Sequence, residues 1–162
     1  MNDVISKKYV TKALYKYFDA DEKMVMLVSD SGFAVLDDYS NNFPNRVFNL
    51  GIAEQASVGI SAGMAFTGLK PIIFGPIPFM VMRAYEQIRY DINEHNTNVK
   101  LIGVSANNSL INLGRSHCMD DDDIKMMELF KNFLILTPTT ENVEESVRKF
   151  IEFDGPAYIR CN

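Results

Sequence analysis

The sequence predicts a three-layer α/β/α domain, in which helices cover both faces of a mostly parallel sheet of about six strands. Short, wholly apolar runs alternate with segments whose apolar residues recur at helical spacing. Clusters of glycine, proline, serine and aspartate separate these segments. No linker, repeat or low-complexity stretch divides the 162 residues, of which 47% are hydrophobic, so we expect residues 1–162 to form a single domain.

The expected strands are short and apolar along their whole length, as in a parallel sheet that is covered on both faces. They cover residues 23–28, 46–49, 71–74, 98–105, 133–137 and 157–160. The first ends at the turn cluster Ser29-Asp30-Ser31-Gly32. The third is followed by Pro76 and Pro78, and because proline donates no hydrogen bond to a ladder, we expect this strand to end at Phe74.

Helix-like spacing predicts helices between these strands. They cover residues 4–18, 52–66, 79–93, 124–130 and 141–153. The second contains the small residues Gly59, Ala62 and Gly63, which favour tight packing against the sheet or, alternatively, a close contact with another chain. The run of acids at residues 120–123 precedes the fourth helix, where the helix dipole stabilises negative charge. A divalent-metal site is the alternative interpretation of this run.

Composition excludes several classes of protein. With 16 basic and 21 acidic side chains the net charge is −5, which argues against a nonspecific electrostatic grip on nucleic acid or on an anionic membrane. Cys118 and Cys161 follow no metal-ligand spacing, which is typical of a reduced cytosolic protein. The chain has neither a spanning apolar stretch nor a secretory signal at its start, so we expect a cytoplasmic location.

Ligands of open parallel sheets bind beyond the carboxyl ends of the strands, so the segments that follow the strands are the candidates for a site. They cover residues 29–32, 49–55, 75–79 and 105–117. The second of them carries the most specific pattern, because Phe48 and Asn49 lead into Leu-Gly-Ile-Ala-Glu-Gln and then into the helix of small residues.

This pattern, residues 48–55, resembles the cofactor-activating segment of the pyrimidine-binding domain of the transketolase family. Further blocks resemble the same domain and occur in the family's order across nearly the whole chain. They are residues 68–71, 83–89, 98–103 and 155–160. The resemblance implies an α/β domain with the thiamine-diphosphate-binding fold and a transferase that makes or breaks a carbon–carbon bond next to a carbonyl group.

The resemblance also implies roles for three residues. Glu54 would hydrogen-bond the N1′ atom of the aminopyrimidine ring of thiamine diphosphate, so that the ring can activate the thiazolium carbon. The alternative interpretation of Glu54 is an acid in the first turn of a helix, where the helix dipole stabilises negative charge. Asp30 would lie near the thiazolium, or would be a turn residue. His117 would face the substrate or the pyrimidine edge and transfer a proton, or would be a surface residue.

Three departures from the family pattern bear on the site. The family's two aromatic positions, one of which stacks on the aminopyrimidine, fall at Ile77 and Met80, although Phe79 lies next to Met80. The family's aspartate before the histidine element is replaced by Leu113. The stretch from His117 toward the next helix is one residue longer than in the family.

The chain contains no Gly-Asp dipeptide, and therefore lacks the Gly-Asp-Gly motif that holds diphosphate and Mg²⁺ in this family. We therefore expect the cofactor to be held mainly by a diphosphate-binding partner subunit, and we assign no metal ligand to this chain. The expected assembly is a homodimer or a hetero-oligomer such as α2β2 that acts on a small carbonyl compound or sugar phosphate. We expect a stand-alone pyrimidine-binding subunit that is inactive without its partner.

Two other functions remain open. The departures at Met80 and Leu113 are compatible with a degenerate member that serves as a non-catalytic scaffold or regulatory subunit. An unrelated signalling domain with Asp30 as phosphoacceptor would leave the pattern around Glu54 unexplained.

Overall fold

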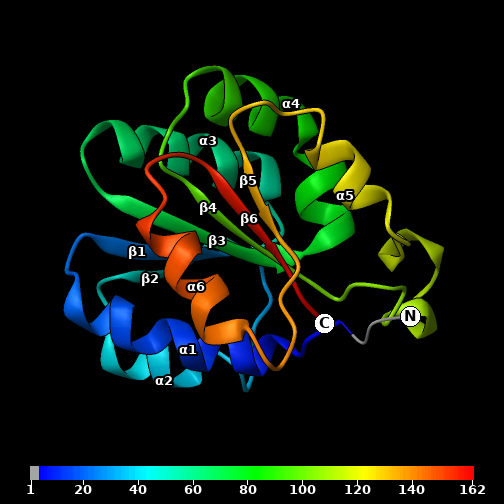
Figure 1. The fold of residues 1–162 in the computed structure, drawn as a ribbon, viewed down its shortest axis with the longest axis horizontal. Helices are drawn as coiled ribbons and strands as arrows, with labels where there is room; N and C mark the ends of the chain where they lie inside the picture. Colours follow the sequence, from blue (N-terminus) through cyan, green and yellow to red (C-terminus); the bar gives the residue numbers. More distant parts are fainter. Residues whose placement is uncertain (1–3) are drawn as a thin grey trace.

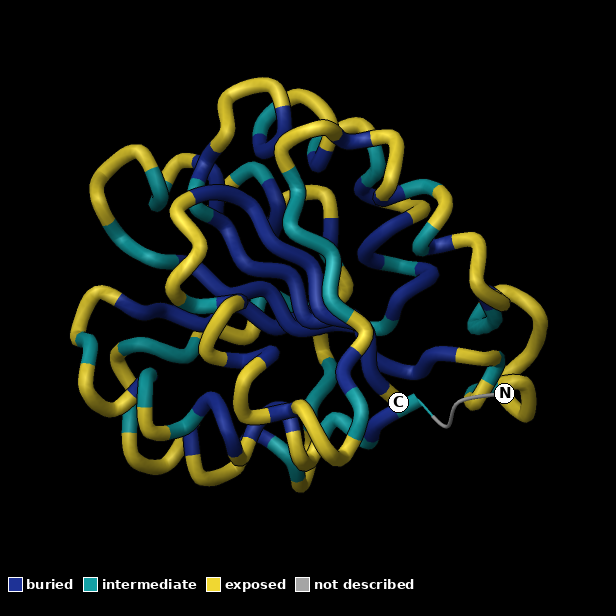
Figure 2. Tube along the Cα trace, in the orientation of Figure 1, coloured by how far each residue is buried: buried dark blue, intermediate teal, exposed yellow. Residues whose placement is uncertain are grey.

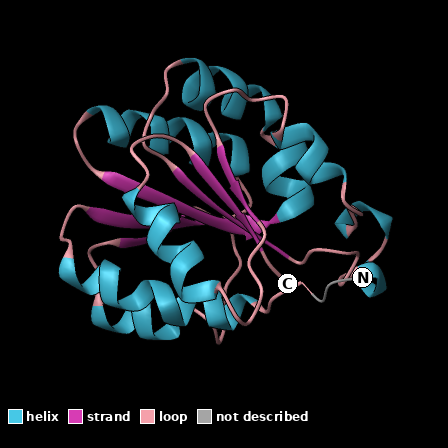
Figure 3. Cartoon of the chain, viewed as in Figure 1, coloured by secondary structure: helices cyan, strands magenta, loops and turns pink. Residues whose placement is uncertain are grey.

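The computed structural model describes residues 4–162, which form one parallel sheet of six strands (Figures 1 and 3). In chain order the strands are β1 (Met24–Val28), β2 (Val47–Asn49), β3 (Lys70–Pro76), β4 (Lys100–Val104), β5 (Leu134–Leu136) and β6 (Ala157–Arg160). They lie in the order β2-β1-β3-β4-β6-β5, and every neighbouring pair is parallel. The predicted fold class is therefore confirmed.

Helices cover both faces of this sheet (Figure 1). One face carries α1 (Lys7–Ala20), α2 (Asp37–Asn42) and α6 (Val143–Glu152). The other carries α3 (Glu54–Phe66), a helical segment made of η1 (Pro78–Arg83), α4 (Tyr85–Gln87) and η2 (Ile88–Glu94), and α5 (Asp122–Met127). Side chains alternate across the strands, so that Ile72 and Ile102 join the first core and Ile73 and Leu101 the second. Figure 2 shows the resulting buried band through the centre of the molecule.

The third strand continues further than predicted. It runs through Pro76, which pairs with Val104 of β4. The pairing of β3 with β1 ends at Phe74, so beyond this point the strand has a neighbour on one side only. A proline is tolerated there because a strand paired on one side does not need every N–H group. The prediction that the prolines stop the ladder at Phe74 was therefore wrong.

The predicted helix over residues 79–93 is present but irregular. Its first part is a π-helix, η1 (Pro78–Arg83), followed by the short α4 (Tyr85–Gln87) and a second π-helix, η2 (Ile88–Glu94). Wider π-helical turns change which side chains share a face and are frequent at functional sites. Helix α2 was not predicted, because its sequence Asp-Asp-Tyr-Ser-Asn-Asn offers few apolar residues with helical spacing.

Two further short helical turns follow β4. They are the 3-10 helices η3 (Ile111–Leu113) and η4 (Arg115–His117). Among residues 4–162, no helix combines the length and apolar character needed to span a bilayer.

Candidate functional site

The strand order places a topological switch point between β1 and β3. The chain leaves β1 toward β2 on one side, but later returns to lie on the other side of β1 as β3. After β1 it enters α2 on one face of the sheet, whereas after β3 it enters η1 on the opposite face. Connections that diverge in this way open a crevice beyond the strand ends, where ligands of doubly wound sheets bind.

Glu54 is buried beside this switch point. It is the first residue of α3 and only 4% exposed, and helix starts favour a negative charge. The helix start is tied to the end of β1, because the Ser57 hydroxyl lies 3.1 Å from the Ser29 hydroxyl. Ser57 also donates a hydrogen bond of 3.1 Å to the carbonyl oxygen of Ala53. These contacts fix the backbone that carries Glu54.

Arg83, at the end of η1, is the partner of Glu54. Its Nη1 atom donates a hydrogen bond of 2.7 Å to Oε2 of Glu54. The guanidinium lies 4.5 Å from the centre of the Phe79 ring, within the range of a cation–π contact. The Phe79 ring in turn meets the imidazole of His117 edge to face, with ring centres 4.9 Å apart. Glu54, Arg83, Phe79 and His117 therefore form one connected set, the switch-point cluster.

Arg83 was not singled out from the sequence, although it begins one of the family-like blocks. Besides that block, the sequence signal is its position four residues after Phe79, which allows both side chains to share one helical face. Its ion pair with Glu54 joins residues 29 positions apart, a distance at which sequence spacing carries no information.

The other predicted cofactor-binding residues differ in their exposure. Ile77 and Met80 are fully buried in the core that lies under α3 and η1, so neither presents a surface to a ring. Phe79 is half-buried and reaches the cluster. Leu113 is 63% exposed and lies in η3, away from the core. Of residues 77, 79 and 80, Phe79 is thus the one that contacts Arg83, the partner of Glu54.

Asp30 lies at the end of β1 on an exposed turn. Its φ of +46° lies in the left-handed region, which aspartate tolerates better than most residues. Its backbone N–H donates to Oδ1 of Asn49 at 3.1 Å, and the N–H of Gly51 donates to the same oxygen at 3.0 Å. Asn49 thereby joins the ends of β1 and β2 to the turn that leads into α3. Among residues 4–162, no hydrogen bond or ion pair joins Asp30 to the switch-point cluster.

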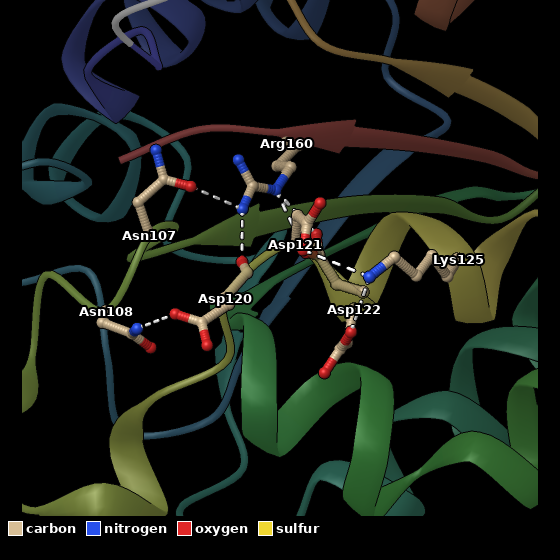
Figure 4. Close-up of polar contacts among 8 residues, drawn as sticks. Asn107, Asn108, Asp120, Asp121, Asp122, Lys125 and Arg160 are labelled. Atoms are coloured by element: carbon tan, nitrogen blue, oxygen red, sulfur yellow. Dashed lines mark hydrogen bonds and ion pairs between the residues drawn. The ribbon is translucent and has the colours of Figure 1, made fainter. Parts of the chain in front are cut away.

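The acidic run at residues 120–123 has two different environments (Figure 4). Asp123 is fully buried and pairs with Arg160, whose Nε lies 2.9 Å from Oδ2; the same oxygen accepts a hydrogen bond of 2.6 Å from the Tyr158 hydroxyl. Burial, with the neighbouring Asp123 charge as a second cause, raises the pKa of Tyr158 well above its usual value. Asp121 and Asp122 are exposed and pair with Lys125.

The buried pair also anchors the loop that leads to His117. Nη2 of Arg160 donates to Oδ1 of Asn107 at 2.9 Å and to the carbonyl oxygen of Asp120 at 2.7 Å, and Asn108 contacts the Asp120 side chain (Figure 4). Within residues 4–162, no three His, Cys, Asp or Glu side chains are grouped to hold a metal ion. Three carboxylates of this run are therefore paired with Lys125 or Arg160, and that of Asp120 is bonded to the amide of Asn108.

The small residues of α3 face in two directions. Ala62 is buried against the sheet, as tight packing requires. Gly63 is exposed, and a side chain at its position would meet nothing within 4 Å. Packing within the chain therefore explains Ala62 but not Gly63.

Comparison with known proteins agrees with this geometry. The family profile described as "Transketolase, pyrimidine binding domain" matches residues 4–162. A protein of Actinobacillus succinogenes that is named as a subunit of apulose-4-phosphate transketolase is 37% identical over 141 residues, 86% of this chain and 45% of that protein. The protein of the same name from Phocaeicola vulgatus is 32% identical over 161 residues, 98% of this chain and 51% of that protein. The chain thus spans about half the length of these two relatives.

The similarity extends to solved structures. One described as "Split gene transketolase, inactive beta4 tetramer" superposes with a TM-score of 0.83 at 30% identity, covering 99% of this chain and 52% of that chain. Both the profile and the superposition extend over nearly all of the described residues, including the strands, α3 and the segment after β3. The chain therefore belongs to the family of transketolase pyrimidine-binding domains.

Proposed function

We propose that this chain provides the pyrimidine-binding part of a thiamine-diphosphate-dependent, transketolase-like transferase that makes or breaks a carbon–carbon bond next to a carbonyl group. The observation that supports this best is the buried carboxylate of Glu54 at the switch point of the sheet. Membership of the transketolase family supports the same chemistry. Because the shared name of the Actinobacillus and Phocaeicola relatives includes a sugar phosphate, we propose a sugar phosphate as the substrate class.

The switch-point cluster suits an aminopyrimidine ring in the kind of groups it offers. A carboxylate that is 4% exposed can share a proton with a ring nitrogen without competition from bulk water. Phe79 supplies an aromatic ring against Arg83, the partner of Glu54, and we propose that this ring takes the place of the family's aromatic residues, which are absent at positions 77 and 80. His117 adds an imidazole in contact with that ring.

Thiamine diphosphate, when bound, supplies a thiazolium carbon that can add to a carbonyl group. The role of Glu54 in this proposal is to orient the aminopyrimidine and to hold a proton at its N1′ atom. His117 moves a proton to or from a substrate oxygen. Asp30 follows β1, the strand that pairs with β3 at the switch point, and we propose that it borders the thiazolium side of the crevice.

We further propose that a partner subunit holds the diphosphate and Mg²⁺. This chain has no Gly-Asp dipeptide, and the described residues include no cluster of metal ligands. Two relatives are named as transketolase subunits, which supports a division of the enzyme between chains. The assembly would be a homodimer or hetero-oligomer in which Glu54 reaches a ring whose diphosphate is bound elsewhere.

The test is reconstitution with the diphosphate-binding partner, cofactor and Mg²⁺. We expect Glu54→Gln, which keeps the shape of the side chain but cannot take up a proton, to lower turnover by about 10²-fold or more. Glu86→Gln is the matched control, because Glu86 is exposed on the neighbouring α4 and should not affect turnover. Equal turnover by wild type and Glu54→Gln would remove Glu54 from the mechanism.

A non-catalytic scaffold is the second candidate function. The exposure of Leu113, at the position where the family has an aspartate, favours it, because an apolar side chain there makes no polar contact with substrate. Calorimetric titration of the reconstituted complex with thiamine diphosphate distinguishes the two functions. A scaffold should bind the cofactor equally well with Glu54 or with glutamine at position 54.

A further inference from the structure

We propose that Arg83 is a positioning residue that keeps Glu54 ionised before the cofactor binds and thereby determines how many protons are taken up on binding. The inference rests on the proposed function of Glu54, but it concerns a residue to which no role has been given. It follows from the contacts of Arg83 with Glu54 on one side and with Phe79 on the other.

A carboxylate as deeply buried as Glu54 is stable only with a partner, because otherwise it takes up a proton and becomes neutral. Arg83 is that partner, at 2.7 Å. The structure shows a single hydrogen bond, from Nη1 to Oε2, and among residues 4–162 no donor is bonded to Oε1. The second oxygen therefore remains for another hydrogen bond while the ion pair persists.

No other described cation is placed to replace Arg83. The elements packed against α3 are β1, β3, η1, α4 and η2. Strand β1 carries no charge, and Lys70 lies at the opposite end of β3, where it pairs with Asp21. On η2, the exposed Arg89 contacts the ring of Tyr90 rather than an acid. Glu86 on α4 and Glu94 on η2 are exposed acids, and the carboxylate of Asp91 on η2 lies near Gly59, more than one helical turn from Glu54. These acids carry the same negative charge as Glu54 and cannot neutralise it, so the charge of Glu54 is compensated by Arg83.

Phe79 restricts where the Arg83 guanidinium can go. The side chain of Arg83 is 42% exposed, and a free arginine so placed would sample many conformations in water. The ring of Phe79, 4.5 Å away, favours the one that faces Glu54. Both residues belong to η1, so the π-helix sets their mutual position.

The proton count follows from these contacts. Before binding, Glu54 is an anion paired with Arg83; after binding, one proton taken from the solvent is shared between Glu54 and the ring nitrogen. Binding near neutral pH should therefore take up about one proton per cofactor. Without Arg83 the carboxyl group already holds a proton, so this uptake should be lost.

Two measurements test the inference. In the isolated chain, the carbon-13 shift of the Glu54 carboxyl carbon, assigned by its loss in Glu54→Gln, reports ionisation directly. We expect an ionised group near neutral pH in wild type and in Arg83→Lys, and a protonated group in Arg83→Met. In the reconstituted complex, titration calorimetry with thiamine diphosphate in buffers of different ionisation enthalpy counts the protons. We expect Arg83→Met to lose most of the uptake and Arg83→Lys to keep it.

Arg89→Met is the matched control, because Arg89 is exposed on η2 and contacts the ring of Tyr90 rather than an acid. Its carboxyl shift and proton uptake should equal those of wild type. A Glu54 that stays ionised in Arg83→Met, with unchanged proton uptake, would overturn the role of Arg83. If instead Glu54→Gln binds the cofactor with wild-type affinity and proton uptake, the proposed function of Glu54 fails, while the carboxyl shifts still decide whether Arg83 keeps this group ionised.

Discussion

Replacing Asp123 by asparagine is expected to destabilise the fold by about 3 kcal/mol. The substitution preserves size but removes the charge that compensates Arg160, whose side chain is 6% exposed. Loss of one partner of a buried ion pair costs about 3–5 kcal/mol. We expect the lower end of this range, because Arg160 keeps two acceptors, Asn107 and the carbonyl oxygen of Asp120.

Urea unfolding followed by circular dichroism measures this loss of stability. If the slope of the unfolding free energy against urea concentration is the same in both proteins, the substitution has not altered the unfolded state. Asp122→Asn is the matched control, because it removes an adjacent, exposed charge that pairs with Lys125 and should cost less than about 1 kcal/mol. A loss below about 1 kcal/mol for Asp123→Asn would refute the reasoning that this pair is desolvated and mutually dependent. The double variant Asp123→Leu/Arg160→Met should be more stable than Asp123→Asn, because it leaves no buried charge.

Two further predictions concern stability. Burial lowers the pKa of Lys100 to about 7 from its ordinary 10.5, so between these values the unfolded chain binds a proton that the folded chain does not. The free energy of unfolding should therefore rise with pH across this interval by up to about 1.4 kcal/mol per pH unit. Urea titrations at several pH values should show a smaller rise for Lys100→Met, and an equal rise with pH in both proteins would contradict this prediction. Gly103→Ala should lower the free energy of unfolding by about 1–3 kcal/mol in the same titrations, because its new carbon would lie 2.6 Å from Tyr158. Gly63→Ala in α3 should instead raise the free energy of unfolding by roughly 0.5–1 kcal/mol. Equal effects of the two alanines would show that the close approach at Gly103 does not matter.

Burial is the largest cause of the lowered pKa of Lys100, while the charge of Asp154 opposes this shift and that of Lys70 adds to it. The amine of Lys100 donates hydrogen bonds of 2.7 Å to the carbonyl oxygens of Phe153 and Gly155. A neutral amine still has two N–H groups, so both hydrogen bonds remain after deprotonation, and loss of the charge removes the cost of its desolvation.

Much of the fold could be predicted from local pattern. The strand at 157–160 agrees with β6, and the apolar runs around β1 and β4 were placed within two residues at each end. Apolar runs and helical spacing are properties of neighbouring residues, and they reflect which faces must leave water. The extension of β3 through Pro76 was missed because it depends on which neighbour is paired at each position, and this is set by the sheet order.

The candidate site divides in the same way. Glu54, Phe79 and His117 could be selected from sequence blocks. Arg83 also lies in such a block, but its pairing with Glu54 could not be predicted, because it depends on the contact between α3 and η1. The structure likewise buries Ile77 and Met80 beside Phe79, since the wider turns of η1 determine which of these neighbours faces the core.

The sequence by itself determined the kinds of elements, their approximate limits and the family, because these follow from the spacing of apolar residues and from short motifs. Only the tertiary structure decided the partners of the buried charges: Glu54 with Arg83, 29 residues apart, and Asp123 with Arg160, 37 residues apart. The physical reason is that a buried charge must be compensated by whichever group the fold brings within hydrogen-bond distance, and this proximity arises from the crossover connections of the sheet.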